Sequence, residues 1–590
     1  MSRTSVPPRR ARTALLAAGA LVLAGLGAVS VMQSPASAAG LQCSVGYSVN
    51  DWGGGFTANV SVTNAGTTAI DGWALTYAYS GNQTLTSGWS ANWTQSGKNV
   101  TVTNLDWNKT LAPGGSTSFG GNFNYSGTNT APTAFAVNGT PCNGGTSTGS
   151  PTPTPTDSTS PSPSPSTSTP PATGDLVDNP YVGAGVYVDP EWSAKAAAEP
   201  SGTKISNQPT AVWLDRIAAI NGANGSMGLR AHLDEAVKQA AGKPLVVQLV
   251  IYDLPGRDCS ALASNGELGP TDIDRYEHEY IDPIATILSD PAYKDLRIVN
   301  TIEPDSLPNL VTNVSPRPTA TPACDVMKAN GNYVTGVGYA LAHLGGVGNV
   351  YNYLDAGHHG WIGWDDNFAP TAQLMHQAAT TSGATVDDVQ GVIANTANYG
   401  ATTEPYFTID DTVNGTSVRQ SKWVDWNRYV DEQTYAQAFR TAMVTAGFNS
   451  SVGALIDTSR NGWGGANRPT GPAAKTTLDG YVDGSRTDRR FHLGNWCNQS
   501  GAGIGERPKA APAVGIDAYV WVKPPGQSDG ASSAIANDEG KGFDRMCDPT
   551  YTGNVRNGNS MSGALPNAPL AGHWFSAQFQ ELLKNAYPAL

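Results

Sequence analysis

A proline-rich tract divides the sequence into two parts that must fold separately. In residues 144–176, Pro alternates with Ser and Thr. The tract TPTPTDSTSPSPSPSTSTPP contains a single charged residue, Asp157. This composition cannot bury a hydrophobic core, so we expect an extended, semi-rigid linker. Because 590 residues are too many for a single core, we expect at least one domain on each side.

The first 39 residues read as a secretory signal peptide. Several arginines precede an apolar run from Ala14 to Val29, and the small-residue site Ala36-Ser37-Ala38 follows. This order predicts cleavage and a secreted, extracellular protein. The alternative that stays open is an uncleaved membrane anchor, although the run is short for a membrane span.

Composition excludes several classes of partner. The net charge is −13, and charged residues make up only 14% of the chain. We therefore expect no nucleic-acid or membrane partner, and a monomer. The 15 Trp are many for a weakly charged chain, which is compatible with stacking on neutral sugars, although buried Trp is the commoner use.

Six cysteines are compatible with a disulfide framework. In an exported protein an even number favours disulfides, and pairing of sequence neighbours would join Cys43 to Cys142, Cys259 to Cys324 and Cys497 to Cys547. The sequence holds no CxxC motif and no Cys/His cluster. We therefore expect neither a metal site nor a cofactor.

Residues 40–143 have the pattern of an all-β sandwich. Short alternating runs rich in Val, Thr, Tyr and Trp are separated by Gly, Asn and Ser. Trp73 leads such a run and is expected in the core, whereas Trp52, Trp89 and Trp107 stand in turn-like contexts. The segment resembles a family 2 carbohydrate-binding module, from LQCSVGYSVNDW to APTAFAVNGTPC. The resemblance implies that these three Trp stack on crystalline cellulose; simple packing is the alternative.

In the second part, acidic residues follow buried strands. LRIVNTI is followed by Glu-Pro-Asp305-Ser, LVVQLVIY by DLPGRD with Asp258, and VGIDAYVWV by KPPGQSD with Asp529. Parallel strands carry chemistry at their carboxyl ends. Taken alone, each acid could only cap a helix. Together they suggest carboxylates converging on one rim, as glycosidic bond cleavage requires.

Residues 177–590 alternate strand and helix patterns, which predicts a parallel α/β barrel. We expect about seven strands, in PYVGAGVYV, LVVQLVIY, LRIVNTI, VGNVYNYL, VQGVIAN, VGALIDTS and GIDAYVWV. Helices are expected at Thr210–Asn221, Leu229–Ala241, Ile273–Leu288 and Phe575–Ala586. Polar and aromatic residues after the strands supply candidate sugar contacts, namely Asp355, His358, Trp361, Trp364, Asn395, Trp496 and Lys523. The adjacent His358 and His359 favour hydrogen bonding over metal binding.

This part resembles glycoside hydrolase family 6, the inverting cellulases. The motifs are VIYDLPGRDCSALASNGE, IEPDSLPNLVTN, YLDAGHHGWIGW, IANTANY, GNWCN and YVWVKPPGQSDG. The resemblance implies an α/β distorted parallel barrel of fewer than eight strands. It also implies that Asp305 is the general acid and that Asp258 raises its pKa or receives a proton through water. Asp529 matches the proposed general base, and Tyr252 and Ser264 would place sugar and water. The alternative is that Asp258 has no catalytic role and is only a structural salt-bridge partner of Arg257.

The resemblance also bears on the mode of attack. In this family long loops roof the groove and accompany release of cellobiose from non-reducing chain ends, and Cys259–Cys324 and Cys497–Cys547 would close long loops here. We therefore predict an exo-acting cellulase. The alternatives are an endo-β-1,4-glucanase on the same scaffold and a non-catalytic cellulose-binding protein. The insertion at residues 404–429 has no assigned role.

Overall fold

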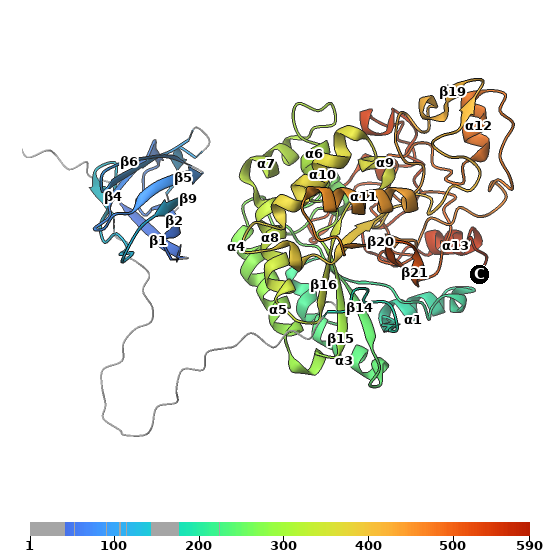
Figure 1. Ribbon diagram of the computed structural model, residues 1–590, viewed down its shortest axis with the longest axis horizontal. Coiled ribbons are helices and arrows are strands. Elements are labelled where there is room, and N and C mark those ends of the chain that lie inside the picture. Colours follow the sequence, from blue (N-terminus) through green and yellow to red (C-terminus); the bar gives the residue numbers. More distant parts are fainter. Residues whose placement is uncertain are drawn as a thin grey trace, which may run out of the picture. The chain divides into compact units, whose positions relative to one another are not determined.

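The computed structural model describes residues 42–51, 53–89, 91–105, 108–113, 115–142, 176–223 and 225–590. The expected signal peptide and nearly all of the expected linker lie outside these ranges, as do Trp52 and Trp107. The chain forms two compact units, which divide between Ser164 and Pro165, within the expected linker. Figure 1 shows them as the blue and the green-to-red parts.

The N-terminal unit is an antiparallel sandwich, as predicted. One sheet is formed by β1 (Cys43–Asp51), β2 (Gly55–Asn64), β9 (Ser116–Asn124) and β5 (Thr84–Trp89), in that order. The other has the order β11 (Thr140–Pro141), β10 (Phe135–Val137), β4 (Ala74–Ala78), β7 (Asn99–Thr103) and β6 (Asn92–Ser96). A short pair, β3 (Ile70–Asp71) and β8 (Thr110–Leu111), adjoins them.

The sandwich core contains residues from both sheets. Trp73 is fully buried, stacks on Phe119 at 4.9 Å between ring centroids and donates its indole N–H to the Asn108 carbonyl, which confirms the predicted core role. Trp93 is half-buried against Phe119 and Phe123. Trp89 ends β5, opposite Gly120. Its side chain lies outside the described part, so the strip of three Trp stays a prediction.

The C-terminal unit is built around one curled, mostly parallel sheet. Its order is β12 (Gly185–Val186), β14 (Leu245–Ile251), β15 (Leu296–Ile302), β16 (Val350–Asp355), β17 (Gly391–Ala394), β20 (Gly453–Asp457), β22 (Ile516–Val520) and β21 (Lys509–Ala513). A further strand, β13 (Val212–Leu214), pairs with β14, and only β21 runs antiparallel. The predicted parallel sheet of about seven strands is confirmed.

A hydrogen bond brings the two sides of the sheet together. Ala211, just before β13, donates its N–H to the carbonyl of Trp521, just after β22, at 3.1 Å. The sheet therefore curls into a distorted barrel. Its interior is filled by alternate strand residues such as Val246, Val250 and Val299, while their neighbours point outward. Strands buried on both faces explain the continuous apolar runs of the sequence.

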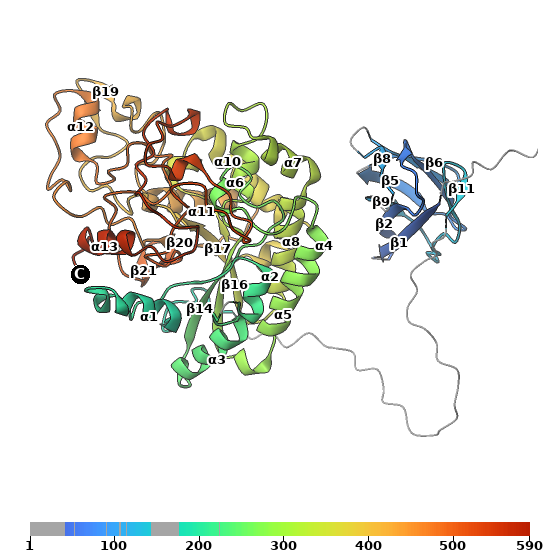
Figure 2. The same ribbon diagram turned by 180° about the vertical axis from the view of Figure 1, so that it is seen from behind.

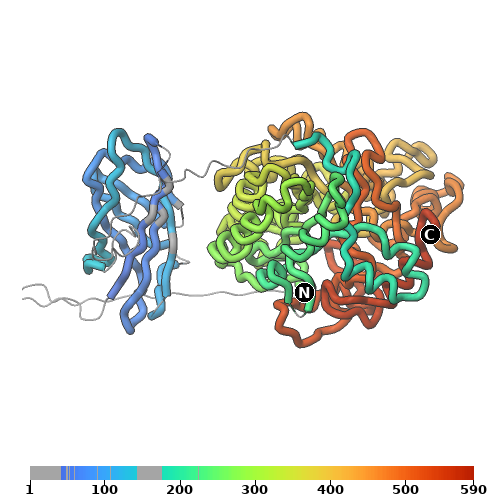
Figure 3. Tube along the Cα trace, turned by 90° about the horizontal axis from the view of Figure 1, so that it is seen from below, coloured from blue at the N-terminus to red at the C-terminus, as the bar shows by residue number. Residues whose placement is uncertain are grey.

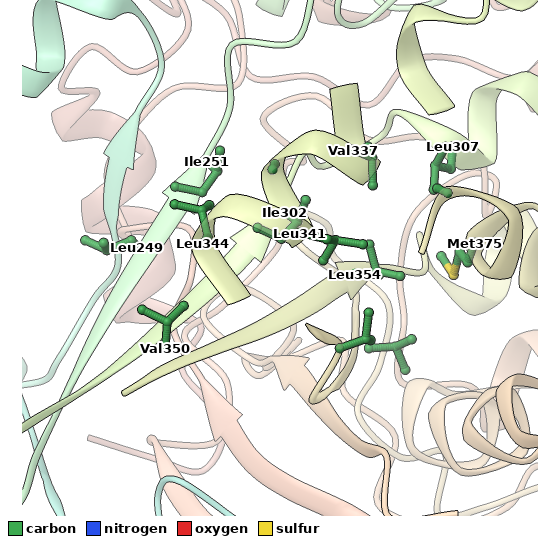
Figure 4. Close-up of a cluster of buried hydrophobic side chains, with 14 of the residues drawn as sticks. Leu249, Ile251, Ile302, Leu307, Val337, Leu341, Leu344, Val350, Leu354 and Met375 are labelled. Carbon is green, nitrogen blue, oxygen red and sulfur yellow. The ribbon is translucent and has the colours of Figure 1, made fainter. Parts of the chain in front are cut away.

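Helices cover the outer face of the barrel (Figures 1 and 2). In Figure 4, Val337, Leu341 and Leu344 of helix α8 lie against residues of β14, β15 and β16. The helices are α1 (Pro190–Ala198), α2 (Ile217–Asn221), α3 (Leu229–Ala240), α4 (Ile273–Arg275), α5 (Asp282–Leu288), α6 (Leu307–Thr312), α7 (Pro322–Asn330), α8 (Asn332–Gly345), α9 (His359–Ile362), α10 (Asp365–Ala378), α11 (Glu432–Ala446), α12 (Leu478–Ser485) and α13 (Ser576–Lys584). A π-helical turn, Tyr276–Ile281, joins α4 to α5.

Two sequence predictions differ from the structure. The expected helix Thr210–Asn221 is strand β13 followed by the short α2. The helical spacing of Trp213, Ile217 and Ile220 suggested one helix, but Trp213 lies in the strand and only Ile217 and Ile220 lie in α2. The first expected strand shrinks to the two-residue β12. Helix α13 packs beside α1, although the two are far apart in sequence (Figure 3). Phe579 of α13 and Trp192 of α1 belong to one hydrophobic cluster.

Candidate active site

The carboxyl ends of the parallel strands open onto one cavity, of about 360 Å³. Its wall includes Tyr252 after β14, Asp305 after β15, and Lys523 and Asp529 after β22. Nine predicted site residues line it, namely Tyr252, Ser264, Asp305, His358, Trp361, Trp364, Trp496, Lys523 and Asp529. The structure thus brings together segments that are more than 250 residues apart in sequence.

Asp305 lies at the point where β15 gives way to a tight turn. Pro304 ends the strand, and Asp305 has a left-handed backbone with φ of 60°. Its main-chain N–H donates to Oδ2 of Asp355 at 3.0 Å. Among the described residues, no group donates a hydrogen bond to its carboxyl, which therefore faces the cavity unpaired. A non-glycine residue held at positive φ is typical of a functional position.

The surroundings of Asp305 favour its protonated form. Burial raises the pKa of its carboxyl well above the ordinary value, and the charges of Asp355 and Asp258 raise this pKa further. Asp355 is itself buried, and burial raises its pKa to about 6. The sequence pointed to Asp258 alone as the neighbouring acid. The structure adds Asp355, which lies in direct contact with the Asp305 main chain.

Asp258 lies behind the cavity wall and is 1% exposed. The hydroxyl of Tyr252 donates to its Oδ2, and burial raises the pKa of its carboxyl, an effect that Tyr252, Arg257 and the Ser264 hydroxyl partly offset. Arg257 stacks on the Tyr252 ring at 4.2 Å, and its ion pair is with Asp253, at 3.6 Å. The alternative that Asp258 merely pairs with Arg257 is therefore not favoured.

Asp529 is held by several donors. Its Oδ1 accepts from Nη1 of Arg460 at 2.8 Å, and its Oδ2 accepts from the Tyr399 hydroxyl at 2.6 Å and the Asn498 N–H at 2.8 Å. The Lys523 ammonium lies 3.9 Å from Oδ1, and burial lowers the pKa of this lysine to about 8. Asp529 therefore lies on the wall in an orientation fixed by hydrogen bonds to both of its oxygens.

Two predicted sugar contacts, Asp355 and Asn395, lie behind the wall rather than on it. Asn395 is fully buried with φ of 64°. Its amide donates to the Asp457 carbonyl at 2.8 Å, and its side-chain oxygen accepts from the Gly400 N–H at 2.9 Å. The side chain thus supports the loop after β17. Direct contact of either residue with a sugar stays a prediction.

Histidines near the cavity form a possible ligand cluster. Ligand atoms of His358, His359 and Glu432 lie within 4.8 Å of one another. However, Glu432 already accepts from Nδ1 of His359 at 2.6 Å and from its N–H at 3.1 Å. Burial lowers the pKa of His358 well below its ordinary value. Hydrogen bonds therefore join His359 to Glu432, whereas Nδ1 of His358 has no hydrogen-bond partner among the described residues.

Tryptophans on the wall can stack on sugar rings. Besides Trp361, Trp364 and Trp496, the wall includes Trp213 of β13, which sequence reasoning missed. Its indole N–H donates to the Val522 carbonyl at 2.9 Å, and the Lys523 ammonium lies 5.1 Å from its ring centroid. The sequence does contain a signal for Trp213. Val212-Trp213-Leu214 is an apolar run followed by Asp215, which is the order of strand and acid seen at Asp305, Asp258 and Asp529.

Loops closed by disulfides supply part of the cavity wall. The structure contains Cys259–Cys324 and Cys497–Cys547, as well as Cys43–Cys142 in the sandwich, as predicted. Arg556 joins two segments of this wall. Its Nη1 donates to the Ser260 carbonyl at 3.1 Å, and its Nη2 donates to the Thr319 carbonyl at 3.0 Å. Lys541 likewise bonds to Asp215 at 3.0 Å. We call these segments, residues 260–262, 317–319, 537–544 and 554–556, the roof.

A carboxyl of raised pKa, further carboxylates and several Trp in a partly roofed cavity define a glycoside-cleaving site. Residues 179–586 match Glycosyl hydrolases family 6, and residues 43–142 match the Cellulose binding domain family. The chain belongs to glycosyl hydrolases family 6, whose members act with inversion.

Similar proteins agree with this assignment. The chain is 52% identical over 434 residues to Exoglucanase A of Cellulomonas fimi, an alignment that covers 70% of this chain and 49% of that one. It thus spans about half the length of that relative. It is 33% identical over 436 residues to 1,4-beta-D-glucan cellobiohydrolase C of Emericella nidulans, covering 71% and 80%. The catalytic domain of Cellulomonas fimi Cel6B superposes with a TM-score of 0.67 at 50% identity, covering 70% and 96%.

Proposed function

We propose that the protein is a secreted cellulase that hydrolyses β-1,4-glucosidic bonds with inversion and releases cellobiose from non-reducing chain ends. The observation that carries this proposal is Asp305, a cavity carboxyl with raised pKa at the end of a barrel strand. The names of the similar proteins, exoglucanase and cellobiohydrolase, support the substrate and the exo mode. Among the described residues, no helix is long and apolar enough to cross a membrane.

In this mechanism Asp305 gives its proton to the oxygen of the departing sugar while water attacks the anomeric carbon from the opposite face. The bond from that carbon to the departing oxygen breaks, and a bond to the water oxygen forms. Because Asp305 must be protonated before each cycle, burial and the neighbouring Asp355 and Asp258 keep it in the form that the reaction needs.

The attacking water must lose a proton, and two carboxylates could receive it. Asp529 is held in a fixed orientation by hydrogen bonds from Arg460, Tyr399 and Asn498. Asp258 is buried with a raised pKa, and the hydroxyls of Tyr252 and Ser264 both interact with its carboxyl. Tyr252 and Ser264 lie on the wall next to it. We therefore assign Asp258 as the proton acceptor through these hydroxyls, and Asp529 to orienting the water and sugar.

The exo mode rests on the roof. Arg556 ties segments that are 237 and 296 residues away in sequence, so the cover over the cavity is cross-linked rather than a set of independent loops. A closed cover would admit a chain only by its end, whereas an endo-acting enzyme needs an open groove. The endo-β-1,4-glucanase alternative requires that these contacts open.

The N-terminal sandwich would hold the enzyme on crystalline cellulose through Trp52, Trp89 and Trp107. Replacing all three Trp by Ala should abolish adsorption to crystalline cellulose and leave cleavage of soluble oligosaccharides unchanged, since the barrel has its own cavity. The matched control is Asn82→Ala in the same unit. Full adsorption by the triple variant would contradict the proposed strip.

The activity itself is tested by incubating the whole chain with cellotetraose and following products by NMR. We expect cellobiose whose newly formed reducing end is initially the α-anomer, because inversion converts the β-linkage. An initial β-anomer would overturn the inverting mechanism. An absence of product would leave cellulose binding as the function.

A further inference from the structure

The insertion at residues 404–429 folds around a hydrophobic core of its own. Phe407, Val418, Trp423 and Val424 are buried in it together with Tyr481 of α12. Figure 1 shows β19 (Thr416–Ser417) beside α12, and β18 (Thr412–Val413) forms a hairpin with β19. The cavity residue Trp364 packs against this same cluster. The insertion is therefore a structured addition fixed to the rim of the site.

Trp426 in this insertion points to solvent. It is 56% exposed, whereas Trp423, three residues earlier, is 8% exposed and supplies the core. No other large hydrophobic side chain of the insertion is as exposed among the described residues. A single exposed aromatic ring outside any broad apolar patch is too small for a protein interface, but its flat face is large enough to stack on one sugar ring.

The backbone holds Trp426 in place at a conformational cost. Asp425 and Trp426 have φ of 46° and 65°, a region that bulky residues rarely adopt. Arg419 keeps the turn closed: its carbonyl accepts from the Trp426 N–H, and its Nη2 donates to the Trp426 carbonyl, both at 2.6 Å. Backbone strain of this kind persists only where surrounding contacts enforce it, and it gathers at binding sites.

The same turn is joined to the cavity wall. The indole N–H of Trp364 donates to the Asp425 carbonyl at 2.7 Å. Trp364 lines the cavity, so its ring and the exposed ring of Trp426 are carried by one hydrogen-bonded unit. Next to it, Arg428 and Asp365 form an exposed ion pair, whose polar groups could meet sugar hydroxyls.

We propose that Trp426 is a stacking platform for a β-linked glucan chain outside the cavity, continuing the row of sugar contacts beyond Trp364. This inference rests on the proposed cellulase function. The platform would take hold of a chain lifted from the cellulose surface before it reaches Trp364. Arg419 is then a positioning residue, because it touches the Trp426 turn rather than the sugar.

The test compares long and short substrates with the whole chain. Trp426→Ala should lower kcat/KM for amorphous cellulose relative to kcat/KM for cellotriose by about fivefold, the size expected for one aromatic stacking contact. Trp426→Tyr, which keeps a flat ring, should recover most of the ratio. Arg419→Ala should lower the ratio in the same direction. Val514→Ala, at a 90% exposed apolar position on the turn between β21 and β22, is the control and should leave both rates unchanged.

An unchanged ratio in a folded Trp426→Ala variant, with a normal thermal unfolding midpoint, would overturn the platform. A Tyr variant as defective as the Ala variant would also overturn it, since stacking would then not be the cause. If the unmodified chain hydrolyses neither substrate, it is the proposed cellulase function that fails, so the two failures are distinguishable.

Discussion

The main-chain N–H of Asp305 donates to the side chain of Asp355, and this 3.0 Å hydrogen bond joins the ends of neighbouring strands β15 and β16. The contact holds Asp305 in its left-handed conformation and places a second negative charge beside its carboxyl. One buried residue thus helps to fix the position of the proposed acid and adds to the effect of burial on its pKa.

Asp355→Asn should move the alkaline limb of the pH–activity profile to lower pH. Asn can still accept the Asp305 N–H, but it lacks the charge that raises the pKa of Asp305, so that pKa falls and the protonated form is lost earlier on raising pH. We expect a shift of about one unit in the alkaline limb of kcat/KM. Asp290→Asn, at the exposed ion pair with Arg230, is the control. A limb that stays in place would show that the Asp355 charge does not contribute to this pKa.

Asp305→Ala should lower kcat on cellulose by about 10²–10⁴-fold, the usual contribution of a general acid. The loss should be much smaller on an aryl cellobioside with a strongly acidic phenol, because that leaving group departs without protonation. Steady-state rates on both substrates measure the difference. Equal losses on both would mean that Asp305 is not the acid.

Chemical rescue by azide separates the two candidate proton acceptors. If Asp529 activates the water, Asp529→Ala should regain activity with azide, which attacks in place of water and appears as a cellobiosyl azide. We expect no such rescue, because the Asp529 carboxylate is bound to Arg460 and Tyr399. Asp258→Ala should lower kcat at least as much. Detection of cellobiosyl azide with Asp529→Ala would reverse the assignment.

Arg556→Ala should loosen the roof by removing the bonds to Ser260 and Thr319. On amorphous cellulose, the share of new reducing ends that remain on the solid should then rise about threefold, since internal bonds become accessible and each lost bond is worth about 1 kcal/mol. Arg230→Ala removes an exposed ion pair far from the cavity and serves as the control. An unchanged share would mean that Arg556 does not govern closure.

The sequence predicted the candidate site best where a short local pattern was enough to locate a residue. Strand-then-acid order located Asp305, Asp258 and Asp529, because parallel strands necessarily deliver their carboxyl ends to one edge. Trp213 was missed because a three-residue strand is too short to show period-two alternation against a competing helical spacing. Contacts such as Asp305–Asp355 and Arg556–Thr319 depend on tertiary placement, which no local pattern encodes.

Whether the roof stays closed during catalysis is tested most directly by the products of the unmodified chain. Amorphous cellulose is digested, and new reducing ends are counted separately in solution and on the washed solid. The account predicts that nearly all appear in solution, as cellobiose. A large insoluble share would contradict exo action and identify an endo-β-1,4-glucanase.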